Sequence, residues 1–229
     1  MPRQPRYFIP GVPQHVVQRG VDRQAVFFEY DDYQRYLQTL QDATAQYGCN
    51  VHAYVLMTNH VHLLATPLSE RALPQIMQAL GRSYVQKINA KYDRTGPLWQ
   101  GRYKASIVQS ERYLLLVYRY IEMNPVRARM VARPADYFYS SYAANALGRN
   151  DGLVTAHPVY LALGKNLKTR RERYRRFFED SLSNEELTNI RDTTNACRVL
   201  GSDQFKDQIE RMLGRSVRPG KSGRPRIVG

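Results

Sequence analysis

Two adjacent runs of apolar and β-branched residues, 51–57 and 60–66, constrain the fold of this chain more than any other stretch. Each run has the length of one strand, and β-branched and aromatic residues favour strands. Thr58 and Asn59 separate the runs, and two residues suffice for the tight turn of an antiparallel pair. The stretch therefore predicts a β-hairpin.

The segments around this hairpin alternate between strand and helix patterns. A short strand at 15–18 precedes an amphipathic helix that begins near Asp31 and has Gly48 at its C-cap. After the hairpin, apolar residues at helical spacing predict a helix over 73–92, and a further strand ends near Val108. This order is that of the split βαβ, ferredoxin-like arrangement. We therefore expect an α+β fold with an antiparallel sheet, two helices on one face and the other face open.

The rest of the chain predicts smaller helical parts. We assign residues 1–145 to the α+β domain, 146–182 to a basic helical extension and 183–229 to a small helical module with a basic tail. Ser183 begins a capping box, and Ser202 is a second candidate N-cap. Short helices of this kind resemble a small DNA-binding module.

His60 and His62 open the second strand of the hairpin. Residues two apart in a strand point to the same face, so the two imidazoles project together. If Val61 and Leu63 face the helices, the histidines line the open face of the sheet. Two imidazoles can bind a metal ion, although such a pair is weak support for a metal site by itself.

A later helix supplies further candidate groups. Ser110 is its candidate N-cap, and Pro125 ends it at or before Asn124. Tyr120 and Asn124 are one turn apart and can point at the same spot. The amide oxygen of Asn124, together with two neutral imidazoles, would form a three-ligand site for Mg²⁺ or Mn²⁺ that leaves positions open for phosphate oxygens and water.

The charge predicts an anionic partner. Lys and Arg number 34 against 20 Asp and Glu, which gives a formal net charge of +14. Cations that meet phosphates release counterions, so this excess favours nucleic acid, with a basic enzyme that lacks such a partner as the alternative. Segment 99–104 mixes aromatic planes with cations, and the tail carries a Gly-Arg-Pro sequence similar to minor-groove hooks. The candidate DNA-binding residues are Arg19, Arg23, Trp99, Arg102, Tyr103, Lys104, Arg215, Arg218, Lys221, Arg224 and Arg226.

Cysteine usage and hydropathy predict a cytoplasmic protein. Cys49 and Cys197 match no metal or redox spacing, which suits a reduced compartment. The first residues lack the apolar core of a signal peptide, and the longest apolar run, 113–118, is too short to span a bilayer. We therefore expect no membrane partner.

Together these motifs resemble the single-tyrosine HUH transposases of the IS200-like family, and within them the REP-associated tyrosine transposases. The resemblance implies an endonuclease and strand transferase that acts on single-stranded DNA hairpins through a 5′-phosphotyrosine intermediate. It implies His60 and His62 as metal ligands and Tyr120 as the nucleophile, whereas Asn124 stands where related insertion-sequence enzymes carry a Gln ligand. The resemblance rests on Gln18-Arg19-Gly20, Asn59-His60-Val61-His62, Leu98-Trp99-Gln100-Gly101-Arg102-Tyr103-Lys104, Tyr120-Ile121-Glu122-Met123-Asn124-Pro125-Val126 and the basic C-terminal segment.

Two other functions fit the same residues. In a metal-dependent nuclease that uses water, Tyr120 only packs and no DNA becomes linked to the protein. In a hairpin-binding protein without catalysis, binding is salt-sensitive and survives the loss of His60. Tyr113 and Tyr118 are competing nucleophiles, but Tyr118 lies on the apolar stripe of its helix and Tyr113 has Val117 one turn beyond it. Both a monomer and a dimer are compatible with the sequence.

Overall fold

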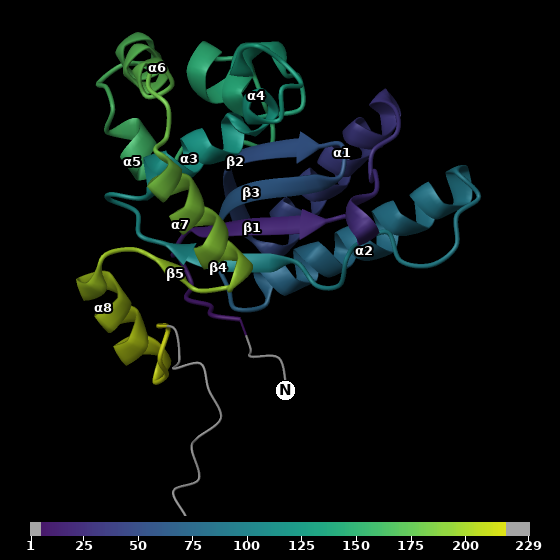
Figure 1. Cartoon of the computed structure of the whole chain (residues 1–229), viewed down its shortest axis with the longest axis horizontal. Helices are drawn as coiled ribbons and strands as arrows, with labels where there is room; N and C mark the ends of the chain where they lie inside the picture. Colours follow the sequence, from purple (N-terminus) through teal and green to yellow (C-terminus); the bar gives the residue numbers. More distant parts are fainter. Residues whose placement is uncertain (1–5, 219–229) are drawn as a thin grey trace, which may run out of the picture.

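A mixed sheet forms the centre of the molecule, with helices packed on both of its faces (Figure 1). The computed structural model describes residues 6–218. Within that range the sheet has five strands in the order β2-β3-β1-β4-β5; β1 to β4 pair antiparallel, whereas β5 runs parallel to β4. The strands are β1 Gln14–Arg19, β2 Cys49–Met57, β3 His60–Pro67, β4 Lys104–Val108 and β5 Val199–Leu200.

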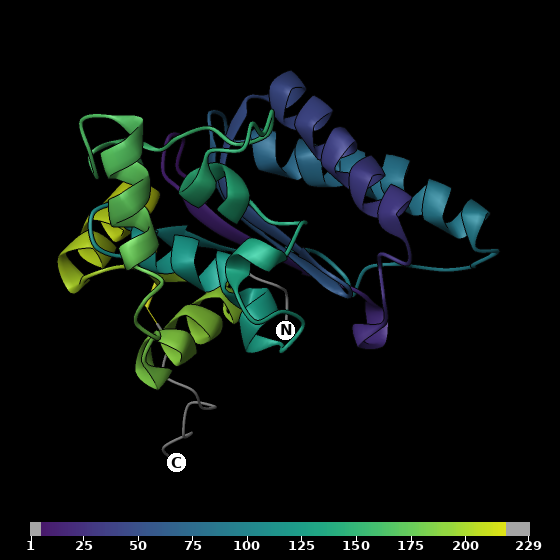
Figure 2. The same ribbon diagram turned by 90° about the horizontal axis from the view of Figure 1, so that it is seen from above.

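The predicted hairpin and its two flanking helices are confirmed. β2 and β3 pair antiparallel on either side of the predicted two-residue turn. α1 (Tyr30–Tyr47) ends at Gly48, whose φ of 74° lies in the left-handed region that glycine adopts without strain. α2 (Ala72–Lys91) lies beside α1, and both cover one face of the sheet (Figure 2). Val61 and Leu63 are buried in the core between that face and the helices, as expected.

The opposite face is also covered, which corrects the prediction of an open face. Ala53, Val55 and Leu64 project from it and are fully buried. Burial of apolar surface contributes roughly 25 cal/mol per Å², so this face is stabilised by the helices that follow β4 (Figure 2). Among residues 6–218, no helix is long and apolar enough to cross a bilayer. The helices and turns are η1 Val21–Arg23, α3 Leu114–Glu122, α4 Asn124–Arg127, η2 Pro134–Asp136, η3 Ala143–Leu147, α5 Pro158–Leu161 and α6 Leu167–Arg176.

The helix predicted to follow residue 110 begins later than expected. Ser110 is not its N-cap, because residues 110–113 form a turn and α3 starts after them. Pro125 ends α3 as predicted, and it lies in the first turn of α4, where its missing N–H costs nothing. Tyr120 therefore stands on α3, and Asn124 is the first residue of α4.

The C-terminal segment joins the sheet. Ser183 and Ser202 are N-caps, as predicted, of α7 (Asn184–Asn195) and α8 (Asp203–Leu213). The strand between these helices, β5, has two residues, too few for a recognisable strand pattern. It pairs with β4, and α7 packs against β1, β4 and β5. The predicted division at residues 145 and 182 stays a prediction, but part of the proposed third segment completes the sheet of the first.

Candidate active site

His60 and His62 lie on β3 and project from the sheet face that α3 covers. Their ring centroids are 5.0 Å apart and their planes meet at 77°. On the neighbouring strand β1, Arg19 stands opposite His60 and Val17 opposite His62. The structure thus brings the two imidazoles together, as their spacing in the strand predicted.

A third histidine belongs to the same cluster. His15 on β1 is buried, and its Nε2 lies 2.8 Å from Nδ1 of His62. Its other ring nitrogen, Nδ1, lies 2.9 Å from the hydroxyl of Thr194, near the end of α7. The Thr194 hydroxyl also lies 3.2 Å from Oγ of Ser106 on β4. A chain of hydrogen bonds therefore connects β3, β1 and α7.

The surroundings keep these imidazoles neutral. Burial, reinforced by the charge of Arg127, lowers the pKa of His15 to about 3. Burial and the nearby Arg19 lower the pKa of His60 to about 4, and burial with several neighbouring cations lowers that of His62 well below its ordinary value. Neutral imidazole is the form that binds metal ions.

Tyr120 faces the histidines from α3. Its ring centroid lies 5.6 Å from that of His15 and 5.7 Å from that of His62, each in an edge-on arrangement. The side chain is 5% exposed. Tyr118, two residues earlier, points elsewhere into the core and is fully buried, as the sequence predicted. Tyr120 is therefore the tyrosine of α3 that meets the imidazole cluster.

The donor atoms fit a mixed nitrogen and oxygen metal site. Nδ1 of His60 lies 2.6 Å from the amide oxygen of Asn59, and Nδ1 of His62 is bonded to His15, which leaves Nε2 of each ring as the atom that could bind a metal ion. The amide nitrogen of Asn124 donates to the Tyr120 carbonyl at 3.2 Å, which leaves the Asn124 amide oxygen as an acceptor. No group of three His, Cys, Asp or Glu side chains suited to a metal ion occurs within residues 6–218. A complete coordination shell would therefore need oxygen from an amide, water or phosphate.

Arg127 places a cation against Tyr120. Its guanidinium lies 4.5 Å from the centre of the Tyr120 ring and donates to the Tyr120 carbonyl at 2.6 Å. Burial lowers the pKa of Arg127 to about 10, so the group remains charged at neutral pH. A fixed cation here would stabilise negative charge on the phenol oxygen or on a phosphate beside it.

Comparison with known proteins decides the family. Residues 10–124, just over half of the 229, match the family model described as "Transposase IS200 like". The chain belongs to this family. Members of the family are transposases, so the protein is an enzyme of DNA transposition. No curated protein matches the sequence.

Two solved structures resemble this transposase. One is a REP-associated tyrosine transposase bound to a REP hairpin, with a TM-score of 0.54 and 17% identity over 69% of this chain and 93% of that chain. The other is a putative transposase from Deinococcus radiodurans R1, with a TM-score of 0.37 and 21% identity over 52% of this chain and 95% of that chain. The similarity to the REP-associated tyrosine transposase shows that the two proteins share a fold.

A buried carboxylate anchors the helix of Tyr120 in this transposase. Glu122 is fully buried and accepts hydrogen bonds from Ser141 Oγ at 2.5 Å, Asn145 Nδ2 at 2.8 Å and Tyr174 Oη at 2.7 Å. Burial raises the pKa of Glu122 to about 7, although the three hydrogen bonds oppose the shift. The network ties α3 to η3 and α6 and so fixes the rotation of α3 about its axis.

The predicted DNA-binding residues fall into separate places. Arg19 lies beside the imidazole cluster, and Arg23 is exposed in the turn after β1. Arg102 and Lys104 are exposed, and Lys104 donates to Asn195 on α7 at 2.9 Å. These contacts leave the predicted DNA-binding role of the four cations as a prediction.

Two of the predicted DNA contacts have other partners in this structure, and their DNA-binding role stays a prediction. Trp99 is 7% exposed and packs in the core near Tyr36 and Tyr84, so its ring is not presented to a base. Arg218 pairs with Asp207 at 2.5 Å and Glu210 at 2.6 Å, so two carboxylates already neutralise it.

The other predicted cations of the tail divide between the described and undescribed parts of the chain. Arg215 donates to the Arg6 carbonyl at 2.8 Å and lies 4.4 Å from the Tyr7 ring centre. The remaining predicted contacts, Lys221, Arg224 and Arg226, lie outside the described residues.

Sequence reasoning missed His15, Arg127 and Glu122 as parts of the site. The alternation along β1 could have indicated which face His15 takes, but not its partner on β3, which depends on register. Arg127 is one turn beyond Met123, and its position relative to Tyr120 depends on the break between α3 and α4. Glu122 faces residues more than eighteen positions away, which no local pattern indicates.

Proposed function

We propose that this transposase is a metal-dependent endonuclease and strand transferase that cuts single-stranded DNA at REP-like hairpins and carries the cut end on Tyr120. The observation that carries the proposal is the edge-on contact of the Tyr120 ring with the imidazoles of His15 and His62, at 5.6 and 5.7 Å between centroids. A tyrosine whose only role was packing would need no such neighbours.

The covalent step is a transesterification. The Tyr120 oxygen bonds to the scissile phosphorus as the bond to the 3′ oxygen breaks, and the leaving oxygen takes up a proton to become a 3′-hydroxyl. A free phenol has a pKa of about 10, so on the order of 0.1% is ionised at neutral pH. The Arg127 cation, 4.5 Å from the ring centre, places positive charge beside the reacting groups. Attack by a second 3′-hydroxyl on the phosphotyrosine then rejoins the strand without ATP.

His60, His62 and Asn124 are the residues proposed to hold Mg²⁺ or Mn²⁺. Two neutral imidazoles and one amide oxygen leave coordination positions for phosphate oxygens and water. A divalent ion in such a site offsets the charge that develops on the phosphate. Arg19 and Arg127, which lower the pKa of His62, add positive charge on the same side of the sheet.

Charge supports a DNA substrate, and a structural relative supports the hairpin form. The formal net charge of +14 suits a polyanion. The similar REP-associated tyrosine transposase was solved with a REP hairpin bound to it. We infer that the present chain recognises a related hairpin, and that it meets this DNA in the cytoplasm as a monomer or a dimer.

A denaturing gel of protein, labelled hairpin DNA and Mg²⁺ tests the proposal. With the label at the 3′ end, wild-type protein is expected to shift labelled DNA to a protein-linked band. With the label at the 5′ end, it should release a fragment whose 3′-hydroxyl a polymerase can extend. Tyr120→Phe should lose both products, whereas Tyr118→Phe, its control on the same helix, should keep them.

The same gel separates the alternatives. Cleavage without any protein-linked band would favour a nuclease that uses water. Binding without cleavage, unchanged in His60→Ala, would favour a hairpin-binding protein that has no catalytic activity. A protein-linked band that persists in Tyr120→Phe would show that Tyr120 is not the nucleophile.

A further inference from the structure

A cavity lies on the sheet face opposite the imidazole cluster. It has a volume of about 610 Å³ and opens between the first turns of α2 and the segment that leads into β4. Gln18 of β1 lines it, and Gln18 pairs with Val61, whose side chain is in the core beneath α1 and α2. The volume is within the range of roughly 300–1,000 Å³ that small-ligand sites occupy.

The cavity is strongly cationic. Arg6, Arg71 and Arg102 line it, and no carboxylate does. Within residues 6–218 none of these three arginines forms an ion pair with Asp or Glu. Burial and the like charge of Arg102 both lower the pKa of Arg6. Three arginines around one cavity without a carboxylate partner favour an anionic ligand such as a phosphate.

Arg6 also offers a flat surface. Its Nε and Nη2 donate to the carbonyl of Tyr103 at 3.1 and 2.7 Å, and its guanidinium lies 3.7 Å from the centre of the Tyr103 ring. These contacts hold the guanidinium plane in one orientation. Arginine planes and aromatic rings are the surfaces on which unpaired bases stack.

A buried amide marks the inner wall. The Gln18 side chain is 8% exposed, and its Oε1 is buried without a hydrogen-bond partner. A buried polar atom without a partner is unfavourable, and a turn of the Gln18 side chain toward a ligand in the cavity would supply one. The edge of a nucleobase carries adjacent donors and acceptors that match a glutamine amide.

We propose that this cavity binds one unpaired nucleotide of the DNA strand, with the base on the Arg6 plane and against Gln18 and the phosphate between Arg71 and Arg102. The proposal rests on the proposed function for its choice of DNA as ligand. The nucleotide site is separate from the proposed active site, because the cavity and the imidazole cluster lie on opposite faces of the sheet. Binding in the cavity therefore needs neither Tyr120 nor the histidines.

Fluorescence anisotropy with two labelled single strands tests the proposal, using the full chain in EDTA so that no cleavage occurs. One strand is a run of twelve deoxyadenosines, and the other has the same backbone with every base removed. Gln18→Leu is expected to weaken binding of the first strand about fivefold or more and to leave binding of the abasic strand unchanged. Arg71→Ala and Arg102→Ala should weaken binding of both strands.

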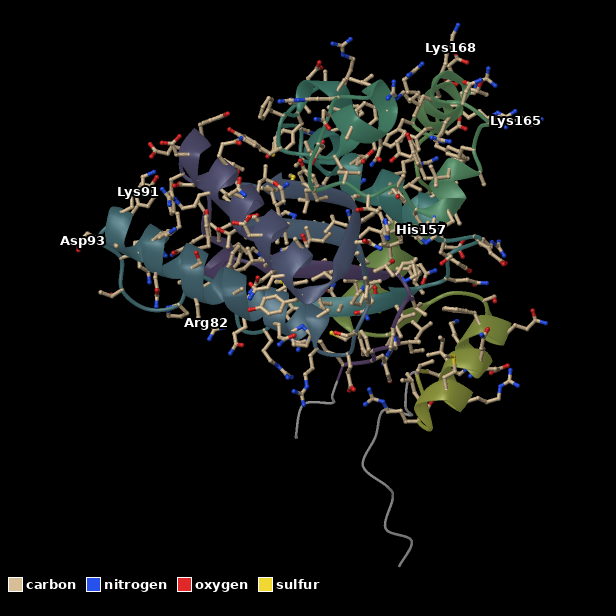
Figure 3. The ribbon with its side chains drawn as sticks, turned by 180° about the vertical axis from the view of Figure 1, so that it is seen from behind. Arg82, Lys91, Asp93, His157, Lys165 and Lys168 are labelled. Atoms are coloured by element: carbon tan, nitrogen blue, oxygen red, sulfur yellow. The ribbon has the colours of Figure 1, made fainter. Side chains whose placement is uncertain are left out.

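Arg82→Ala is the matched control. Arg82 is an exposed arginine of the same helix α2, it points away from the body of the molecule (Figure 3), and it does not line the cavity. Its loss removes the same charge and should change binding of either strand less than twofold. Thermal melting of Gln18→Leu checks its fold, and the exposed Arg102 provides a test that does not disturb the core.

The proposal is overturned if Gln18→Leu, folded, binds the deoxyadenosine strand as tightly as wild type, or if Arg71→Ala and Arg102→Ala behave like Arg82→Ala. The cleavage gel separates this failure from failure of the proposed function. If the protein cleaves DNA but the cavity variants bind both strands as wild type does, only the nucleotide site is rejected. If Gln18→Leu weakens binding only of the strand that has bases, but the wild-type protein cleaves no DNA, only the proposed function is rejected.

Discussion

Nε2 of His15 lies 2.8 Å from Nδ1 of His62, and this contact orients one of the two predicted metal ligands. With Nε2 of His62 assigned to a metal ion, its Nδ1 carries the proton and donates to His15. His15 then donates through its own Nδ1 to Thr194, 2.9 Å away. Groups that orient a ligating histidine in this way raise metal affinity and fix the ring.

Replacing His15 should therefore weaken metal binding. We expect His15→Ala to lower Mn²⁺ affinity by about 10- to 100-fold, because His62 loses the acceptor that sets its proton position. Calorimetry in the absence of DNA measures this directly. His52→Ala is the control, since His52 is likewise buried with both ring nitrogens bonded, at 2.7 and 2.8 Å, but lies away from the cluster. Equal affinity in His15→Ala and wild type would contradict the orienting role.

The choice of metal ion follows from the ligand atoms. Mg²⁺ prefers an octahedral shell of oxygen, whereas Mn²⁺ accepts imidazole nitrogen more readily. We expect half-maximal cleavage at a Mn²⁺ concentration about tenfold or more below that of Mg²⁺, as measured by titration of each ion into the gel assay. EDTA should abolish cleavage and leave hairpin binding in place. Undiminished cleavage in EDTA would rule out a metal-dependent reaction.

Arg127 should affect the rate of phosphotyrosine formation. Its cation lies 4.5 Å from the Tyr120 ring centre, in a buried setting where charge is weakly screened. We expect Arg127→Ala to slow single-turnover formation of the protein–DNA band by about 10- to 100-fold and Arg127→Lys to restore part of the rate. Exposed Arg129, two residues further on, provides the control, and Arg129→Ala should react at the wild-type rate. A wild-type rate in Arg127→Ala would contradict this role.

Glu122 should make stability depend on pH. Its pKa is raised from 4.5 to about 7 in the folded protein, so the folded state holds a proton that the unfolded state releases. Stability from this group is therefore lost as pH rises from about 4.5 to 7, by about 3 kcal/mol. Histidines whose pKa is lowered, such as His15 and His60, act in the opposite direction over pH 4 to 6.5, so the effect of Glu122 must be measured as a difference.

Glu122→Gln isolates that difference. The amide keeps an acceptor for Ser141 and Asn145 and can donate to Tyr174, but it does not ionise. The melting temperature of Glu122→Gln minus that of wild type should rise by several degrees between pH 5 and pH 8. Glu185→Gln, at an exposed site on α7, should show no such trend. A difference that stays constant with pH would mean that Glu122 does not titrate in this range.

Local patterns in the sequence predicted most helices and strands, but they predicted less well which of these pack or pair with one another. The hairpin, α1 with its Gly48 cap, α2 and the capped starts of α7 and α8 follow from apolar periodicity and cap residues, which act within a few positions. Strand β5 has two residues and forms because β4 offers a free edge, which is a property of the assembled sheet.

In the candidate site, too, contacts within one strand or helix were predicted from the sequence, whereas contacts between strands were not. The spacing of His60 and His62 predicted their common face, and the helical turn predicted Tyr120 near Asn124. His15 could not be predicted as a partner of His62, since their contact depends on which strands are neighbours. The core position of Trp99 could not be predicted either, because composition alone does not distinguish an aromatic residue that binds a base from one that fills the core.

Thr194 supplies the last hydrogen bond of the chain that runs through His15 to His62, and it comes from a helix near the end of the described structure. During synthesis, β1 and β3 leave the ribosome more than a hundred residues before that helix does. The cluster can therefore be completed only after α7 has been made. Until then a nascent chain would hold His15 and His62 without the hydrogen bond from Thr194.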